Sequence, residues 1–419
     1  MRPWYRNLDW PTLAAWLALV GVGLIAIYSA THGPAREFLL DSVQQNFNRQ
    51  LIFFGVSAAV MAVILLLPAR FLIRLAPLAY IFCLGLLGAA LVFGREVNGA
   101  KSWVYIGGFG LQVAEIAKVG TVLAVTAVLA SKEARQGRIS RLLFAAAVIL
   151  VPAVLVVLQN DTGTGLVFLS LIPVMLFWSG AIPLSWMALM TAPAVAVYLV
   201  IVNPLLAAAF VVAFGVGMLV LSRSRMMGAL ALVSSGAIAI LASIFLFQIL
   251  EPHQIDRIVA FNDPEEFREG AGFHVIQAKA AIGSGGLFGK GFTNGTQTQL
   301  AYIPENSTDF IFCVIGEEFG FVGAAIVLGL FAFLLIRLAG LGVSAGFALP
   351  RLFIAGVTGI FLVHILINIG MTVGVMPVIG IPLPFISYGG SALLANTAML
   401  AIALNLHARR DEFAVYTSQ

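Results

Sequence analysis

Charged residues are scarce in this sequence. Lys, Arg, Asp and Glu together make up only 10% of its 419 residues, whereas an ordinary soluble domain carries roughly 25%. Hydrophobic residues make up 61%. So few charges cannot cover a surface exposed to water, so the composition excludes a soluble globular protein and indicates a polytopic membrane protein.

Cysteine is also nearly absent, since Cys83 and Cys313 are the only two, and each lies inside an apolar run. Two isolated thiols support neither a disulfide framework nor a cysteine metal cluster. The net charge is only +4, and the basic residues gather in short loops, which is typical of membrane orientation. We therefore expect no nucleic-acid partner.

Long apolar runs recur along the whole chain, and a length criterion of about 20 residues predicts about twelve membrane-spanning helices. The runs cover residues 10–30, 50–67, 72–94, 113–130, 142–158, 164–180, 185–202, 205–221, 227–250, 310–336, 352–371 and 385–406. With the N-terminus inside, the basic clusters all fall on the cytoplasmic side. We expect an all-α polytopic integral membrane protein with both termini cytoplasmic and residues 1–419 forming a single membrane domain.

The one long hydrophilic segment, residues 251–308, lies on the extracytoplasmic side in this topology. Loops of such length are usually functional or disordered. Within it, "GFHVIQAKAAIGSGG", residues 272–286, has the apolar spacing of a helix on the membrane surface. The overlapping "GSGGLFGKG", residues 283–291, lacks the Ser or Thr that follows Lys in a phosphate-binding loop, so its glycines predict flexibility.

Ionisable residues inside or beside apolar runs are costly in a membrane and usually face a cavity or a partner. They are Glu115, Lys118, Asp161, Asp309, Glu317, Glu318 and His364. Glu115 and Lys118 are three residues apart, so they share one helix face and can pair. Asp161, at a predicted outer helix junction, can join them in a buried triad. Such a triad serves either helix packing or function, and the residues leave both open.

Asp309 stands where the polar segment "AYIPENSTD" enters an apolar run. Ser307, Thr308 and Asp309 all suit the N-cap position of a helix, where a carboxylate is favourable. The alternative is a working carboxylate at the outer edge of the membrane. Glu317 and Glu318 follow in the same predicted helix and indicate helix packing or the polar floor of a cavity.

Two features of the last third of the chain concern packing. His364 and Asn368 are one turn apart and favour hydrogen bonds between helices. The three prolines of "PVIGIPLPFIS", residues 377–387, predict irregular backbone. At membrane depth such backbone is tolerated where it is buried in protein or lines a cavity, and a stiff outer loop is the alternative.

Motifs along nearly the whole chain, in order, resemble those of the SEDS family (shape, elongation, division and sporulation). They are "LDWPTLAAWLALVGVGLIAIYSAT", "FNRQLIFF", "NGAKSWVYIGGFGLQVAEIAKV", "QNDTGTGL", "HQIDRIVAFNDPEE", "GAGFHVIQAKAAIGSGGLFGKGFTNGTQTQLAYIPENSTDFIFCVIGEEFGFVGA" and "GVMPVIGIPLPFISYGGSALLANTAML". The stretch "GTQTQLAYIPENSTDFIF" resembles the elongation members of the family more than the division members.

The resemblance implies a helical bundle with a ten-span core, so region 181–250 would hold an extra pair of spans. It implies a peptidoglycan glycosyltransferase of the bacterial cytoplasmic (inner) membrane, with its active site facing outside. The enzyme would polymerise lipid II, an undecaprenyl-diphosphate-linked disaccharide peptide, into β-1,4-linked glycan strands for cell elongation and rod shape. Its implied partners are a class B penicillin-binding protein, which supplies the transpeptidase, and elongation-machinery membrane proteins.

The resemblance also assigns residues. The essential aspartate of the family falls on Asp309, which we expect to be catalytic. The family's polar cluster falls on Glu115, Lys118 and Asp161, and Gln112 opens the same helix as the first two. The leaving diphosphate needs positive charge, and the outward-facing candidates are Arg49, Lys101, Arg257, Lys279 and Lys290. A divalent cation, Mg²⁺ or Mn²⁺, is a further candidate, with no metal ligand identified.

Three other functions stay open at this point. A lipid II flippase would also need a polar cavity and charges within the membrane. A division-type member of the family would catalyse the same reaction in another cell-cycle machine. A non-catalytic scaffold would only recruit a penicillin-binding protein, and Asp309 would then tolerate replacement by Asn.

Overall fold

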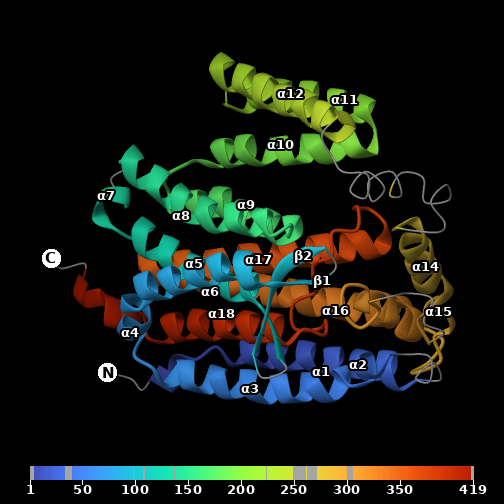
Figure 1. Ribbon diagram of the computed structural model, residues 1–419. Coiled ribbons are helices and arrows are strands. Elements are labelled where there is room, and N and C mark those ends of the chain that lie inside the picture. The colour runs from blue at the N-terminus through green and yellow to red at the C-terminus, as the bar shows by residue number, and fades with distance from the viewer. Residues whose placement is uncertain are drawn as a thin grey trace. The chain divides into compact units, whose positions relative to one another are not determined.

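The computed structural model describes residues 4–33, 40–97, 99–106, 109–135, 138–222, 224–248, 261, 271–299 and 305–416. Helices dominate this part of the chain (Figure 1). Ten of the described helices are long and apolar enough to cross a membrane. The prediction of a polytopic helical membrane protein is therefore confirmed. The span count of about twelve and the cytoplasmic position of the termini stay predictions.

Packing divides the chain into two compact units, Met1–Ser179 with Gln277–Gln419, and Gly180–Ile276. The larger unit contains α1 (Trp10–His32), α2 (Asp41–Gln44), α3 (Asn46–Leu66), α4 (Ala69–Arg74), α5 (Ala76–Phe93), β1 (Arg95–Val97), β2 (Ala100–Ile106), β3 (Phe109–Gln112), α6 (Val113–Leu129), α7 (Lys132–Arg135), α8 (Ile139–Leu158), α9 (Thr162–Trp178), α15 (Thr296–Gln299), α16 (Ile311–Ser344), α17 (Ala348–Val373) and α18 (Gly390–Ala408). It also contains the part of α14 (Ala271–Ser284) that begins at Gln277. Short 3-10 helices cover Trp4–Asn7 and Arg410–Tyr416. The interpretation of the chain as one membrane domain stays a prediction.

The core of the larger unit lies around α17 and α18, most of whose residues are buried. α18 packs against α3 and α6, and α17 packs against α9 and α16. Figure 1 shows these helices, in orange and red, among the blue and green helices of the same unit. Because α17 and α18 have little surface to offer to lipid, their polar residues must find partners within the protein.

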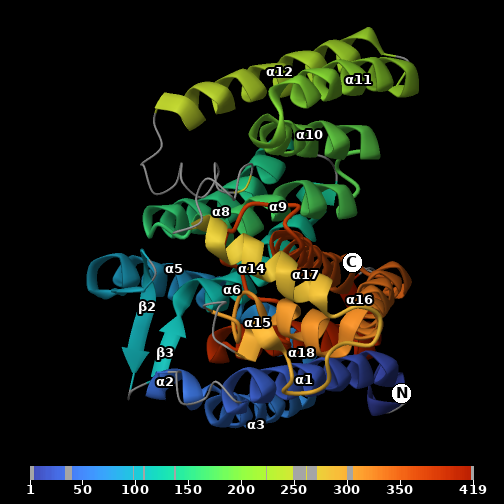
Figure 2. The same cartoon turned by 90° about the vertical axis from the view of Figure 1, so that its right-hand side faces the viewer.

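A small antiparallel sheet was not expected from the sequence. Its strand order is β1-β2-β3, and β2 pairs with β3 from Trp103 opposite Gln112 to Ile106 opposite Phe109. Figure 2 shows β2 and β3 together beside α6. The sheet ends where α6 begins, so it fixes the start of the helix that carries Glu115 and Lys118.

α16 is broken at Gly320, whose φ of 65° and ψ of −161° are not helical. The turn after α14 fills the break: Phe321 and Val322 donate their backbone N–H groups to the carbonyls of Gly286 and Leu287. A Cβ on Gly320 would lie 2.3 Å from the backbone nitrogen of Gly289, so only glycine fits this crossing. The segment 283–291 is therefore a packed turn and not the flexible stretch that its glycines predicted.

The helix predicted within the loop 251–308 is confirmed as α14, and its position on the membrane surface stays a prediction. Its residues Ala278 and Ala281 pack against Phe310 and Cys313 near the start of α16. Both cysteines are buried and free. α14 thus connects the long loop directly to the first turn of the helix that follows Asp309.

The smaller unit contains α10 (Leu184–Val202), α11 (Pro204–Ser222) and α12 (Arg225–Gln248). Leu189, Met218, Met227 and Ala231 form its buried core, with Phe214 packed against them. These helices coincide with three of the predicted apolar runs, in the region where the extra pair of spans was predicted.

The two termini of the chain lie at one end of the larger unit. Asn7 donates to the carbonyl of Ala408 at 3.5 Å, and Arg337 near the end of α16 pairs with Asp9 before α1. Asp309, by contrast, stands before the first turn of α16. Asp9 and Asp309 therefore lie near opposite ends of α16, and the side of the membrane that each end faces stays a prediction.

Candidate active site

Asp309 lies in a turn that leads into α16 and is half-buried. The N-cap residue of α16 is Phe310, so Asp309 precedes the cap position by one residue. The turn is closed by Glu305, which has a φ of 57° and accepts the N–H groups of Thr308 and Phe310 at 3.1 and 3.2 Å. The N-cap position that the sequence allowed for Asp309 is therefore taken by its neighbour.

The backbone before Asp309 is held by the segment 374–389, between α17 and α18. Ser387 donates its hydroxyl to the carbonyl of Thr308 at 2.6 Å, and Tyr388 donates its backbone N–H to the carbonyl of Ser307 at 2.9 Å. Each additional hydrogen bond restricts the turn, so the backbone that carries Asp309 is positioned from outside its own helix.

α3 and α17 complete this support. On α3, Asn46 donates to the Ser307 hydroxyl at 3.2 Å, and Gln50 donates to the Ser387 carbonyl at 3.3 Å. On α17, Asn368 donates to the carbonyl of Asp309 itself at 2.8 Å. Three elements outside the turn, α3 and the consecutive α17 and segment 374–389, thus converge on one turn of five residues.

The proline segment 377–387 is packed into the protein, which decides between its two interpretations. Ile381, Leu383, Phe385 and Ile386 are nearly fully buried. A Cβ built on Gly380 would lie 3.3 Å from Oδ2 of Asp309, so this segment passes directly beside the carboxylate. The irregular backbone forms one wall of the candidate site, and α18 begins only at Gly390.

Two of the predicted cationic residues lie near this wall. Arg49, on α3, is half-buried, donates to Gln45 at 3.1 Å and hydrogen-bonds the Tyr388 hydroxyl. Burial raises the pKa of the Tyr388 phenol despite the opposing effect of Arg49, so the phenol is neutral at physiological pH. Lys279 is exposed on α14, and its side chain packs directly against Gly374: a Cβ added to Gly374 would lie 1.8 Å from Cε of Lys279.

The predicted pair of Glu115 and Lys118 is formed and fully buried. Nζ of Lys118 lies 2.8 Å from Oε1 of Glu115 and 2.7 Å from Nε2 of His364. Nδ1 of His364 lies 3.2 Å from the carbonyl of Pro382, so the ring donates from Nδ1 and accepts from Lys118 at Nε2. Oε2 of Glu115 is buried without a hydrogen-bond partner among the described residues.

Asp161 is not the third member of this cluster. It is the N-cap residue of α9, where it accepts the Thr164 N–H at 3.0 Å, and it accepts from Nε2 of Gln112 at 3.2 Å. The N–H of Gln112 donates to Ser391 at the start of α18. Asp161 therefore connects the start of α9 to Gln112 at the start of α6, and Gln112 in turn connects to the start of α18. In the buried cluster, His364 takes the place that was predicted for Asp161.

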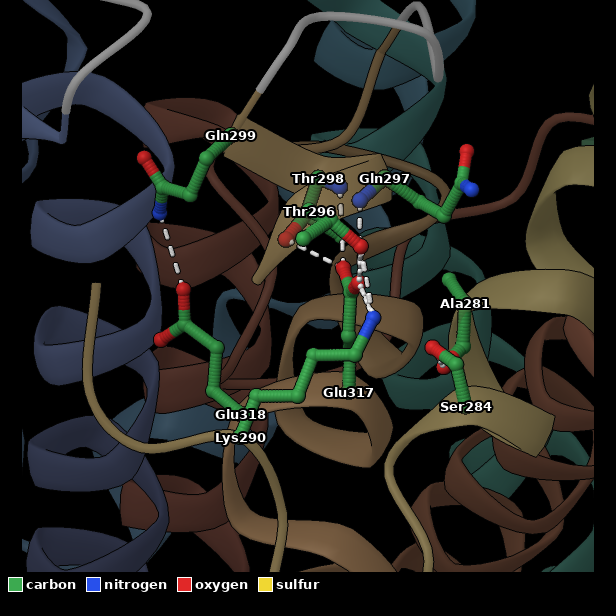
Figure 3. Close-up of polar contacts among 9 residues, drawn as sticks. All are labelled: Ala281, Ser284, Lys290, Thr296, Gln297, Thr298, Gln299, Glu317 and Glu318. Atoms are coloured by element: carbon green, nitrogen blue, oxygen red, sulfur yellow. Dashed lines mark hydrogen bonds and ion pairs between the residues drawn. The ribbon is translucent and has the colours of Figure 1, made fainter. Parts of the chain in front are cut away.

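Lys290 forms a second ion pair, with Glu317, in which the glutamate is buried and the lysine is half-buried (Figure 3). Its Nζ lies 2.7 Å from Oε1 of Glu317 and 2.6 Å from the Thr296 hydroxyl. Glu317 also accepts the backbone N–H groups of Gln297 and Thr298, both at 2.9 Å. The adjacent Glu318 accepts from Ser29 at 2.6 Å and Gln299 at 2.8 Å. Of the two roles predicted for these glutamates, helix packing or the polar floor of a cavity, these contacts favour packing.

The remaining predicted contacts lie further out or beyond the described residues. Lys101 is exposed on β2, and its backbone N–H donates to the carbonyl of Gln159 at 2.9 Å. Arg257 lies outside the described residues. Within the described ranges, no group of three or more His, Cys, Asp or Glu side chains is placed to hold a metal ion. Substrate roles for all the predicted residues stay predictions.

Several supporting residues escaped the sequence analysis. Asn46 and Gln50 are polar residues four apart at the start of an otherwise apolar helix, and this spacing marks one polar face. Tyr388 and Ser391 flank two glycines and gave no signal of their own. The partnership of Asn368 with Asp309 joins residues 59 positions apart, which no local pattern encodes.

Comparisons with known proteins agree with this architecture. The family model described as "Cell cycle protein", covering FtsW, RodA and SpoVE, matches residues 10–203 and 182–412. Peptidoglycan glycosyltransferase RodA of Treponema pallidum is 33% identical over 96% of this chain and 98% of its own length. Peptidoglycan glycosyltransferase MrdB of Escherichia coli is 34% identical over 96% of this chain and 94% of its own.

A solved structure described as "Structural coordination of polymerization and crosslinking by a peptidoglycan synthase complex" contains a similar chain. The two chains are 29% identical and superpose with a TM-score of 0.73 over 96% of this chain and 98% of that one. The resemblance found in the motifs is confirmed over nearly the whole length, and the chain belongs to the FtsW/RodA/SpoVE family of cell cycle proteins.

Proposed function

We propose that this chain is a peptidoglycan glycosyltransferase that polymerises lipid II during cell elongation. The observation that carries the proposal is Asp309, a half-buried carboxylate beside the proline segment, whose backbone is held by three other elements. Relatives named peptidoglycan glycosyltransferase are 33% and 34% identical to this chain over 96% of its length. The elongation role is supported by the RodA and MrdB names of the first matches.

The reaction is a displacement at the anomeric carbon of a diphosphate-linked sugar. The 4-hydroxyl of a second lipid-linked disaccharide attacks that carbon, the bond from carbon to diphosphate oxygen breaks, and the configuration inverts to a β-1,4 linkage. The hydroxyl is a poor nucleophile near neutral pH, so a positioned base accelerates the step by roughly 10²- to 10⁴-fold. Asp309 takes the proton of the attacking 4-hydroxyl, and undecaprenyl diphosphate leaves with the electron pair of the broken bond.

Negative charge develops on the leaving diphosphate and needs nearby cations. Arg49 beside Tyr388 and Lys279 beside Gly374 lie on elements that contact the Asp309 turn or the segment next to it. A divalent cation is a further proposal, because the diphosphate oxygens are themselves good ligands for Mg²⁺. Loss of polymerisation on chelation, restored by Mg²⁺ or Mn²⁺, supports this requirement, and full activity after chelation removes it.

The cellular setting follows from the same proposal. The site faces outside in the cytoplasmic (inner) membrane of a bacterium, where lipid II is polymerised. A class B penicillin-binding protein supplies the transpeptidase that this chain lacks, and the similar solved chain belongs to a complex described as coordinating polymerisation and crosslinking. Elongation-machinery membrane proteins are further partners.

The test is polymerisation by the purified full-length chain. The chain and its class B penicillin-binding protein, with the transpeptidase blocked, are supplied with fluorescent lipid II, and glycan chains are resolved on gels. Polymer that a muramidase digests, in the absence of any other glycosyltransferase, supports the proposal and excludes the scaffold. Movement of lipid II across a vesicle membrane without any polymer would instead support a flippase.

A further inference from the structure

The side chain of Asn368 contacts the backbone of Asp309. This residue is fully buried on α17. Its Nδ2 donates to the carbonyl of Asp309 at 2.8 Å and to the carbonyl of Ile381 at 2.7 Å. A carboxamide nitrogen carries two hydrogens, so both of its donors are used, one on each segment.

These two carbonyls belong to the two segments that meet at the candidate site. Asp309 carries the carboxylate, and Ile381 follows Gly380, which passes beside Oδ2 of that carboxylate. One amide therefore fixes the distance between the carboxylate-bearing turn and the wall opposite it. His364, one turn away on the same helix, contacts the next carbonyl of this wall, that of Pro382. α17 therefore holds the wall at two successive residues.

No other side chain of similar size would do the same. Asp would place an oxygen, with no hydrogen to donate when ionised, against two carbonyl oxygens. Leu would leave two buried carbonyls without donors, a loss that is costly in a dry interior. Oδ1 of Asn368 has no hydrogen-bond partner in the described part of the chain, so the contribution of the residue comes from its donor side.

We propose that Asn368 is a positioning residue for the reaction, which holds Asp309 and the Gly380–Ile381 wall in register so that the carboxylate meets the attacking hydroxyl. The inference rests on the proposed function. A carboxylate displaced by about 1 Å loses roughly 10²-fold in rate, because proton transfer requires close alignment. Substrate binding through other residues is unaffected by such a displacement, so kcat falls and KM changes little.

The chain contains a matched control in Asn405. It too is buried on a helix, its Nδ2 lies within hydrogen-bond distance of the carbonyls of Ile64 at 2.7 Å, Leu67 at 2.9 Å and Leu65 at 3.2 Å, and its Oδ1 has no partner among the described residues. It lies next to Arg409, at the end of the unit where the termini meet. Asn405→Ala therefore removes the same number of donors and the same volume far from Asp309.

The experiment compares Asn368→Ala and Asn405→Ala in the full-length chain with its penicillin-binding protein. Thermal unfolding is measured first, and kcat and KM for fluorescent lipid II are then measured on folded protein at equal concentration. We expect similar losses of thermal stability in both variants. Only Asn368→Ala should lose kcat, by about 10²-fold, with KM within about threefold of the wild type.

A second variant keeps the test valid if Asn368→Ala does not fold. Asn368→Ser retains one donor and should show a smaller loss of kcat. Equal kcat for the Asn368 and Asn405 variants, at normal wild-type activity, would overturn the positioning role alone. A wild-type chain that makes no polymer would instead overturn the proposed function, so the two failures are distinguishable.

Discussion

The larger unit contains two lysine–glutamate pairs of nearly equal length, which differ in burial and in how many hydrogen bonds their carboxylate oxygens accept. In the pair Lys290–Glu317, at 2.7 Å, both carboxylate oxygens accept further hydrogen bonds from residues 296–298. In the pair Glu115–Lys118, at 2.8 Å, one carboxylate oxygen has no partner within the described ranges. Lys290 keeps about 25% of its side chain exposed, whereas Lys118 has none exposed.

This difference predicts that the Lys290–Glu317 pair anchors one segment to another and that the Glu115–Lys118 pair has a role in activity. A carboxylate with every oxygen satisfied has nothing left to offer a substrate, so Glu317 anchors the segment 290–299 to the first part of α16. A buried carboxylate with an unsatisfied oxygen destabilises the fold, so its presence calls for an explanation, and a functional role is one such explanation. Lys118 reaches the Asp309 site through His364 and the carbonyl of Pro382. That the Glu115–Lys118–His364 cluster serves activity and the Lys290–Glu317 pair serves folding stays a prediction, which the following variants test.

The largest stability effect should come from Lys118→Met. It leaves Glu115 as a fully buried charge without a cation, and removing one partner of a buried pair costs about 3–5 kcal/mol. Thermal unfolding of the purified chain measures the loss. The double variant Glu115→Gln with Lys118→Met should recover much of the stability, since no unpaired charge remains, but should not recover polymerisation. Normal specific activity of folded Lys118→Met would contradict the functional role of the cluster.

Lys290→Met should have a smaller effect on stability, about 1–2 kcal/mol, because Glu317 keeps its donors from Thr296, Gln297 and Thr298. Limited proteolysis should detect loosening of the segment 290–299. We expect the KM for lipid II to stay near the wild-type value. A KM raised tenfold or more would support the alternative that Lys290 contacts the diphosphate. It would contradict the statement that the Lys290–Glu317 pair serves folding alone.

The smallest effect concerns the opposite end of the unit, where Asp9 pairs with Arg337. Burial raises the pKa of Asp9, but hydrogen bonds from Arg337 and Thr12 outweigh it and hold the pKa below its ordinary value. A carboxylate with a lowered folded-state pKa contributes stability above its unfolded pKa of about 3.9 and loses it as the pH falls through the folded value. The contribution is about 0.5–1 kcal/mol, since Arg337 is partly exposed.

Thermal unfolding from about pH 6 to about pH 3 tests this pair. The wild-type chain should lose stability towards the acidic end relative to Asp9→Asn, which has no carboxylate to protonate at this position. Parallel curves for the two proteins would show that the pair contributes nothing measurable. Neither protonation of Asp9 nor the Asp9→Asn substitution should change the Glu115–Lys118–His364 cluster. The Asp9–Arg337 pair is therefore a control for the comparison of the two lysine–glutamate pairs.

Much of the fold followed from the sequence because long apolar runs and basic loops are local signals. The helix α14 and the pair Glu115–Lys118 were predicted from spacing of at most a few turns, whereas for Glu317 and Glu318 packing was one of two predicted roles. The break at Gly320 was missed, since a glycine inside an apolar run reads as ordinary helix until another segment fills the gap. The sheet β1-β2-β3 was missed because its strands are short and lack regular alternation.

The candidate site was predicted in its residues more than in its arrangement. Asp309, Glu115 and Lys118 came from motifs, whereas His364 and Asn368 were recognised only as polar residues that would bond between helices. Their actual partners, the carbonyls of Pro382, Ile381 and Asp309, belong to backbone that carries no residue-specific signal. Contacts between a side chain and a distant carbonyl depend on the tertiary fold, so the sequence alone could not specify them.

The most direct test of the central claim, that Asp309 is the base for lipid II polymerisation, is the rate of glycan formation by Asp309→Asn. The matched control is Glu305→Gln, an exposed acidic position in the same turn. We predict that Asp309→Asn folds normally and loses about 10²- to 10⁴-fold in kcat, while Glu305→Gln stays near the wild type. Polymerisation by Asp309→Asn at the wild-type rate would contradict the account.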